Sequence, residues 1–178
     1  MGVLTSLSGN LELSQNTSLT DVSSLSSITS ISGDLYFNNI NSIAITNLSG
    51  LNALESIAGN ATFQGNFSNF QALDNLTYLQ GNLLISSNPS INEINGFNSL
   101  NSINNLFVVD NNVLTSLNGF TNLATITNSL DIGGNPFLSG IDAFDHAITT
   151  SGINISNNPF LSNCSVEAIC NRLPQNRY

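Results

Sequence analysis

Short segments in which apolar and polar residues alternate recur along the whole chain. Each contains an apolar, any, apolar triplet, as in Leu83-Leu84-Ile85. Successive triplets start 24, 26, 22, 23, 24 and 23 positions apart. A period of about 24 residues is typical of leucine-rich-type solenoids, and alternation with period two predicts a short strand that buries one face. The triplets start at Leu11, Leu35, Ala61, Leu83, Leu106, Leu130 and Ile153.

An asparagine follows most triplets at a constant distance, five positions after the first apolar residue. A buried carboxamide has donors and an acceptor, so it can bond to backbone groups of its own coil and of the next one. The second repeat has Ile40 at this position, beside Asn38 and Asn39. We expect a structural ladder of Asn side chains where the strands end. Its predicted members are Asn16, Asn66, Asn88, Asn111, Asn135 and Asn158.

Downstream of each strand, apolar residues recur at every third position. The fifth repeat shows this spacing most clearly, in Leu114, Leu117, Phe120, Leu123 and Ile126. A period of three predicts an outer wall of turns, 3₁₀ segments or short strands, because a long helix would have a period of 3.6. The expected fold is therefore mainly β, a leucine-rich-repeat-like parallel β-solenoid of about seven coils. It forms one domain over residues 1–178, with repeat coils over 1–163.

Residues 164–178 differ from the repeats and are expected to form a cap. Ser165 is a suitable N-cap for a short helix that runs to about Leu173. Cys164 and Cys170 flank its first turns, and a disulfide between them is the preferred interpretation, with two buried free thiols as the alternative. Zinc is not expected, because two thiols without CxxC spacing and the single His146 do not provide four ligands.

Several motifs resemble the receptor L-domain-like relatives of leucine-rich repeats, in particular Asn- and Ser-rich bacterial surface proteins. The resemblance covers nearly the whole chain and implies a right-handed extracellular solenoid used for recognition, but it does not imply a particular ligand. The motifs are Gly9-Asn10-Leu11, Gly59-Asn60, Gly81-Asn82-Leu83, Asn88-Pro89, Asn118-Gly119-Phe120, and Asn158-Pro159-Phe160-Leu161 followed by Cys164.

The charge balance restricts the possible partners. The chain has eleven Asp and Glu residues against two Arg, and no Lys, for a formal net charge of -9. Such a surface lacks the cations that bind phosphates and is repelled by anionic lipid, so nucleic acid is not an expected partner. No apolar run approaches the roughly 18 residues of a membrane span, so no direct membrane insertion is expected. The start of the chain resembles the tail of a preceding coil, and we expect a piece of a longer protein.

The alternation of each strand also predicts which side chains point away from the core. One outward side chain from each repeat would form a row across the sheet, with polar residues on both sides. The side where the strands start carries Asn10, Asp34, Asn60, Asn82, Asn105 and Ser129. The predicted ligand-binding residues are Glu12, Tyr36, Asn38, Thr62, Gln64, Leu84, Phe107, Val109, Asp131 and Asn154.

Exposed apolar groups in a polar rim are typical of a recognition surface, and solenoids use their sheet face in this way. We therefore predict an extracellular or cell-surface recognition or adhesion module that binds a protein or a glycan through its sheet. The alternative is a structural spacer or stalk without a ligand. In that case Leu84, Phe107 and Val109 are partly covered by neighbouring side chains on a sheet, where aromatic and β-branched residues are favoured in any case.

Catalysis and metal binding receive little support. Asp142, Asp145 and His146 place an acid, a base and a metal ligand in one outer segment. However, the sheet has no repeated carboxylates and the chain has no glycine-rich phosphate loop. The closely spaced acidic loops that hold calcium are also absent from the sequence. We expect no enzyme activity, no catalytic residues, no metal and no cofactor.

Overall fold

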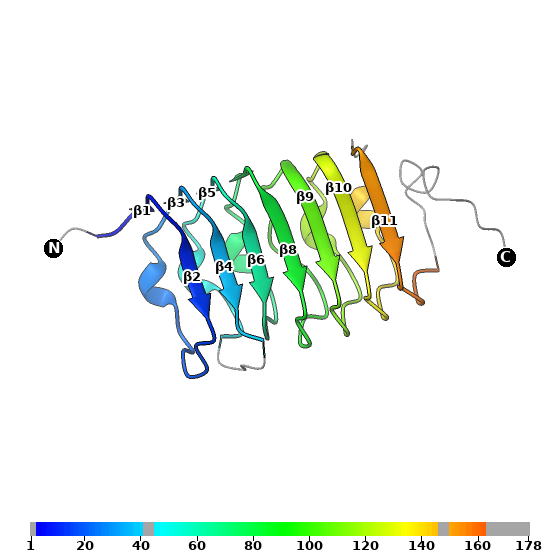
Figure 1. Ribbon diagram of the computed structural model, residues 1–178, viewed down its shortest axis with the longest axis horizontal. Helices are drawn as coiled ribbons and strands as arrows, with labels where there is room; N and C mark the ends of the chain where they lie inside the picture. The colour runs from blue at the N-terminus through cyan, green and yellow to red at the C-terminus, as the bar shows by residue number, and fades with distance from the viewer. Residues whose placement is uncertain (1–2, 41–44, 146–149, 163–178) are drawn as a thin grey trace.

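The computed structural model describes residues 3–40, 45–145 and 150–162, and these form a parallel β-solenoid (Figure 1). Seven strands, one from each coil, make a continuous sheet along one side. The strands of this main sheet are β2 (Leu11–Ser14), β4 (Leu35–Asn38), β6 (Ala61–Gln64), β8 (Asn82–Ser86), β9 (Ser102–Val109), β10 (Thr125–Gly133) and β11 (Gly152–Ser156).

The register of the main sheet is the one that the triplets predict. Leu83 of β8 pairs with Ala61 of β6 on one side and with Leu106 of β9 on the other. All pairs in the sheet are parallel, and equivalent residues of neighbouring repeats lie side by side. The predicted fold class and the strand positions are thus confirmed. The register is strongly specified because a slip by one residue would turn each apolar pair out to solvent.

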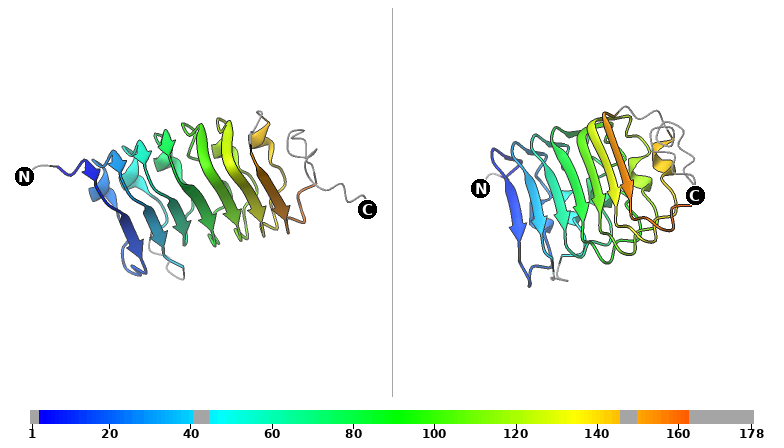
Figure 2. Two further views of the ribbon diagram at one scale, coloured as in Figure 1. Left: turned by 45° about the horizontal axis from the view of Figure 1, so that its top comes forward. Right: turned by 45° about the vertical axis from the view of Figure 1, so that its right-hand side comes forward.

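The other walls of the coils consist of short elements. Four two-residue strands form a second parallel sheet, and 3₁₀ helices lie on the side opposite the main sheet (Figure 2). The residues predicted for the outer wall of the fifth repeat are all buried, as the period of three requires. The short strands are β1 (Ser6–Leu7), β3 (Ser30–Ile31), β5 (Ser56–Ile57) and β7 (Tyr78–Leu79), and the 3₁₀ helices are η1 (Ser23–Leu25), η2 (Ser49–Leu51), η3 (Gln71–Leu73), η4 (Asn118–Phe120) and η5 (Asp142–Phe144).

Strands β9 and β10 are longer than the other strands of the main sheet, which the sequence did not predict. In each of them the short strand and the main strand have merged. Ile126 of β10 pairs with Ile103 of β9, and the next pair is Ser129 with Asn105. The step between these pairs is thus longer in β10 than in β9. The sixth repeat therefore has one extra residue in this interval, and a β-bulge absorbs it.

Phenylalanine side chains continue the core from coil to coil. The rings of Phe97 and Phe120 lie 5.6 Å apart and nearly parallel, and Phe144 continues the stack at 6.1 Å from Phe120. All three are fully buried. Burial of one such ring stabilises the fold by about 1.5–3 kcal/mol relative to its exposure. Each coil thus depends on its neighbours, which accords with the quasi-one-dimensional stability of solenoids.

A ladder of Asn side chains lies where the strands of the main sheet end, and we call it the strand-end ladder. The backbone N–H of Asn88 donates to Oδ1 of Asn111 at 3.2 Å, and that of Asn111 donates to Oδ1 of Asn135 at 3.0 Å. The backbone N–H of Asn135 continues the pattern to Asn158 at 3.0 Å. Asn88, Asn111 and Asn135 are fully buried, so these bonds satisfy backbone groups that water cannot reach.

The second and third coils depart from the expected ladder. Asn39 rather than position 40 supplies the carboxamide of the second coil, and its Oδ1 accepts the backbone N–H of Asn16 at 3.1 Å. Asn66 is only half-buried, and its Oδ1 accepts the hydroxyl of Ser90 instead of a backbone N–H of the preceding coil. Consequently Oδ1 of Asn88 is buried without a hydrogen-bond partner, because the third coil offers it no donor.

The residue before the ladder Asn has a left-handed backbone in five coils. This conformation reverses the chain direction after the strand, and it is costly for residues other than Gly, Asn and Asp. The sequence uses tolerant residues at three of the five positions. The residues and their φ angles are Gln15 (54°), Ser87 (55°), Asp110 (56°), Gly134 (65°) and Asn157 (57°).

Candidate ligand-binding face

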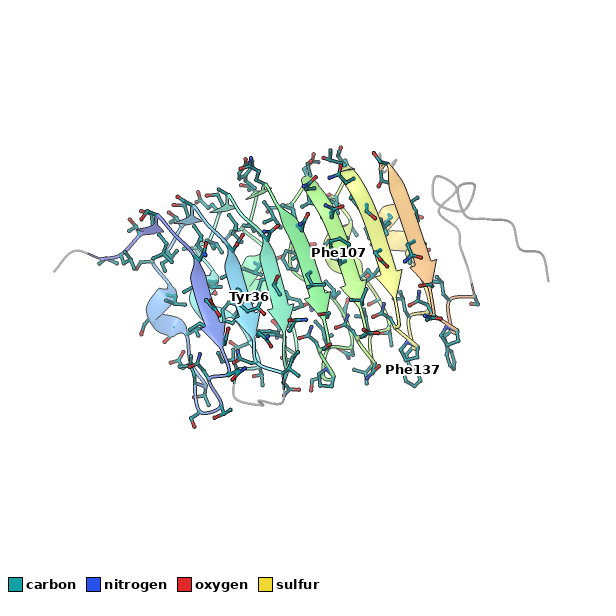
Figure 3. All side chains as sticks on the ribbon, viewed as in Figure 1. Tyr36, Phe107 and Phe137 are labelled. Carbon is teal, nitrogen blue, oxygen red and sulfur yellow. The ribbon has the colours of Figure 1, made fainter. Side chains whose placement is uncertain are left out.

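The predicted outward row exists as a continuous line of side chains across the main sheet, and we call it the central row. Successive members occupy paired positions on neighbouring strands, for example Tyr36 beside Thr62 and Leu84 beside Phe107. Tyr36 and Phe107 lie on the outer face of the sheet, and Phe137 lies at its lower edge (Figure 3). The row runs in the order Glu12, Tyr36, Thr62, Leu84, Phe107, Asp131 and Asn154.

A shallow groove of about 440 Å³ lies over the first five members of the central row. The predicted site residues that line it are Glu12, Tyr36, Thr62, Leu84 and Phe107. These five residues contribute two aromatic rings, one aliphatic side chain, a hydroxyl and a carboxylate, and Asp34 adds a second carboxylate to the groove lining. The other predicted site residues, Asn38, Gln64, Val109, Asp131 and Asn154, lie on the same face outside the groove lining.

The apolar residues of the groove are partly exposed. Tyr36, Leu84 and Phe107 are each half-buried, so neighbouring side chains on the sheet cover part of each one. The apolar side chains with the largest exposure lie elsewhere, at Val3, Leu4, Ile40, Tyr78, Val113, Phe137 and Phe160. The groove thus offers an apolar floor that is accessible but not protruding, a shape that suits a ligand laid along it.

Polar residues of the face bond to one another. Nδ2 of Asn38 donates to the hydroxyl of Tyr36 at 3.0 Å, and this bond holds the tyrosine along its own strand. Nε2 of Gln64 donates to the hydroxyl of Ser86 on the next strand at 2.8 Å. These contacts hold the polar side chains of the face in defined positions, an arrangement that would lower the entropy cost of binding at this face.

A second ladder of side chains lies where the strands start, and sequence reasoning missed it. Oδ1 of Asp34 accepts the backbone N–H of Asn60 at 2.6 Å, and Oδ1 of Asn60 accepts that of Asn82 at 3.0 Å. Gly59 precedes Asn60 because a Cβ there would collide with the Asp34 carboxylate. The recurrent Gly-Asn pair was the sequence signal for this ladder. Its members are Asn10, Asp34, Asn60, Asn82, Asn105 and Ser129.

This second ladder, which we call the strand-start ladder, reduces the set of residues that are candidates for binding a ligand. Its carboxamide oxygens are used by backbone N–H groups of the next coil, so these residues form a wall of the groove and support the sheet. The strand-end ladder has the same structural role on the opposite side. The side chains with spare capacity for a ligand are therefore those of the central row.

Carboxylates are the charged groups of this face. Oε1 of Glu12 accepts the hydroxyl of Ser14 at 2.7 Å, and Oδ1 of Asp131 accepts Nδ2 of Asn154 at 3.1 Å. Each carboxylate therefore keeps its second oxygen outside these bonds. Within the described ranges the chain has no Lys, Arg or His, because Arg172, Arg177 and His146 lie outside them. The negative charge of the face thus has no opposite charge beside it in this part of the protein.

Two hydrogen bonds lower the pKa of the Asp21 carboxyl group. The backbone N–H of Ser23 donates to it at 2.7 Å and the Ser23 hydroxyl at 2.9 Å. These two bonds, the backbone one first, hold the pKa of Asp21 below its ordinary value of 3.8. Asp21 precedes η1 on the outer wall, so this effect belongs to a turn and not to the candidate face.

The remaining sequence expectations fall outside the candidate face. Asp142 begins the 3₁₀ helix η5 on the outer wall, and Asp145 follows it. His146, Cys164, Cys170 and the expected capping helix lie outside the described residues. Among the residues that are described, no group of three or more His, Cys, Asp or Glu side chains is arranged to hold a metal ion.

A larger concavity of about 1120 Å³ opens at the carboxyl-terminal end of the solenoid. Ile155, Leu161, Pro136 and Pro159 are among the residues that line it. No charged side chain is among the described residues that line it. The groove over the central row is therefore the better candidate site.

Comparisons with known proteins support this architecture. Residues 5–76 match the family model of the Receptor L domain. Neither the curated proteins nor the solved structures include a match to the chain. None of the helical segments in the described ranges has the length and apolar character that crossing a bilayer requires. The described residues form a parallel β-solenoid, and residues 5–76 of it are similar to the Receptor L domain, which is consistent with a receptor L-domain-like fold.

Proposed function

We propose that the protein is an extracellular or cell-surface recognition module that binds a protein or a glycan through the central row of its main sheet. The single observation that carries the proposal is the groove of about 440 Å³ in which Tyr36, Leu84 and Phe107 form an apolar floor. Aromatic rings at such a floor provide stacking area and, for tyrosine, a hydroxyl. Apart from Leu35, the rest of the groove wall is polar, as expected of a specific binding site.

The groove spans several coils, so its natural ligand is extended. Tyr36 and Phe107 are separated by three strand spacings, or about 14 Å at about 4.8 Å per strand. A small metabolite would fill only part of this length. A polymer, either a peptide or an oligosaccharide, would contact the whole track.

The test is a binding screen with a matched control. The wild-type protein is applied to a glycan array and to a displayed peptide library, alongside the double variant Tyr36→Ala/Phe107→Ala. The control is Tyr78→Ala/Phe137→Ala, which removes two exposed aromatic rings that lie off the groove. All three proteins are first shown to unfold cooperatively.

The proposal predicts that ligands of the wild type are retained by the control variant and lost by the groove variant. Equal loss in both variants would place binding elsewhere on the surface. An absence of any ligand for the wild type would favour the spacer or stalk.

A further inference from the structure

We propose that the central row binds an extended cationic peptide whose basic side chains are about eight residues apart and flank an apolar middle. This inference rests on the proposed function, because it names the ligand class of the same groove. It follows from the order of side chains along the row, which is acid, aromatic, small, aliphatic, aromatic, acid. The two acids are Glu12 and Asp131.

The distribution of charged residues favours a positively charged ligand. The chain has eleven Asp and Glu residues, of which Glu167 alone lies outside the described ranges, so ten carboxylates are described. The same ranges contain no basic side chain to neutralise them. Asp34 lines the groove beside Glu12 and strengthens the negative end. A surface of one sign attracts a ligand of the opposite sign and repels nucleic acids and acidic glycans.

The distance between the two acids of the row determines how far apart the basic residues of the peptide must be. Glu12 and Asp131 are separated by five strand spacings, which is about 24 Å at about 4.8 Å per strand. An extended peptide rises about 3.3 Å per residue, so about seven to eight residues span this distance. Because successive side chains point to opposite faces, basic residues about eight positions apart bring both of their side chains to the sheet. Both carboxylates keep one oxygen free of the bonds described above, and a Lys or Arg side chain can donate to it.

The middle of the row requires apolar side chains in the ligand. Tyr36, Leu84 and Phe107 lie between the two acids, and only Thr62 interrupts them. Every second side chain of an extended peptide would point to this floor. A neutral glycan could stack on the rings and donate hydroxyl hydrogen bonds, but it brings no positive charge to the two carboxylates, so the cationic peptide uses more of the face.

The experiment measures fluorescence anisotropy with four synthetic nine-residue peptides. The first has Lys at positions 1 and 9, which point to the same face of an extended chain, with Leu and Tyr between them. The second has Glu at both ends, the third has Ser at both ends, and the fourth has its two Lys only four positions apart. We expect the first to bind most tightly, to weaken as NaCl is raised, and to exceed the Glu peptide on the order of tenfold or more.

Protein variants separate the charges of the row from charge in general. Glu12→Gln/Asp131→Asn should weaken the first peptide on the order of tenfold. Glu55→Gln/Asp145→Asn makes the same change in net charge at exposed positions off the sheet face and should leave the affinity unchanged. Equal affinity for all four peptides, or equal weakening by both double variants, would overturn the inference.

The outcomes also distinguish this inference from the proposed function. If a neutral glycan binds and Tyr36→Ala/Phe107→Ala abolishes its binding, the groove is a recognition site and the cationic peptide is wrong. If no peptide and no glycan bind the wild type, both proposals fail. If the first peptide binds and both the groove variant and Glu12→Gln/Asp131→Asn weaken it, both are supported.

Discussion

The carboxamide of Asn135 joins three coils to one another through Asn111. Oδ1 of Asn135 accepts the backbone N–H of Asn111 at 3.0 Å and its side-chain amide at 3.3 Å. Nδ2 of Asn135 donates to the carbonyl of Val108 at 2.9 Å. Asn111 in turn reaches the carbonyl of Ile85 at 3.1 Å, one coil further away. A single side chain per coil thus satisfies the backbone groups that the turn would otherwise leave unpaired.

Removing a carboxamide from this ladder should destabilise the whole protein. Asn111→Ala and Asn135→Ala each leave buried backbone groups unpaired, which should lower the free energy of unfolding by about 1–3 kcal/mol. Urea denaturation followed by circular dichroism measures the loss. Asn112→Ala, at the exposed neighbouring position, is the control and should change little. Wild-type midpoints in both ladder variants would show that the ladder does not contribute.

Asn88 should be the least costly of the buried ladder residues to replace. Its Oδ1 has no partner, and its Nδ2 donates to the carbonyls of Phe63 and Ser86 and to Oδ1 of Asn111. Asn88→Ala therefore loses these three donated bonds, but it leaves no backbone N–H of a preceding coil unpaired and also removes an unpaired buried acceptor. Relative to Asn135→Ala, the loss of unfolding free energy should be smaller by about 1 kcal/mol. The same denaturation series checks the order, and a larger loss for Asn88→Ala would contradict it.

The close stacking of the outer wall makes Gly119 sensitive to substitution. A Cβ at this position would run into the backbone carbonyl of Gly96 on the preceding coil. Because a backbone atom cannot move aside cheaply, Gly119→Ala should lower the free energy of unfolding by about 1–3 kcal/mol.

Gly9→Ala provides the matched control for Gly119→Ala. A Cβ at Gly9 would have no atom within 4 Å, so this variant should lie within about 0.5 kcal/mol of the wild type. Thermal unfolding of both variants provides the comparison. Similar melting temperatures for the two would mean that the coils can separate without cost.

The disulfide between Cys164 and Cys170 remains a prediction from the sequence. In the native protein the intact mass should rise on reduction by the hydrogens added to one bridge. Thiol labelling without reductant should be absent. Quantitative labelling of the unreduced protein would establish two free thiols instead. Cys164→Ser/Cys170→Ser is then expected to melt at a lower temperature, because a disulfide restricts the unfolded chain.

Local patterns in the sequence were enough to predict the strands of the main sheet and the outer wall. Leu83 and Ile85 alternate with polar or outward residues, and only a strand buries both on one face. The period of three from Leu114 to Ile126 likewise indicated 3₁₀ turns and short strands. These features depend on neighbours within a few positions, so one sequence suffices to predict them. The order of the central row followed directly, because equivalent residues of stacked coils share a register.

The remaining features, the membership of the strand-end ladder and the length of the strands, depend on contacts between coils. Whether Asn39 or Asn66 joins the strand-end ladder depends on which carboxamide reaches the neighbouring coil, and a shift of one residue in the turn changes the answer. The short strand and the main strand of the coil merge in β9. This depends on how many residues separate Ile103 from Leu106, compared with the equivalent interval in the next coil.

The strand-start ladder and the half-burial of Tyr36 are also tertiary results. Asp34 bonds to Asn60 across 26 positions of the chain, and the exposure of Tyr36 depends on side chains from the coils on either side. The sequence alone determined that a row of acids and aromatic residues would lie on the sheet. The stacking of the coils decided which of its polar neighbours are used to hold the sheet together and which remain for a ligand, because hydrogen bonds between coils form only when the coils are packed.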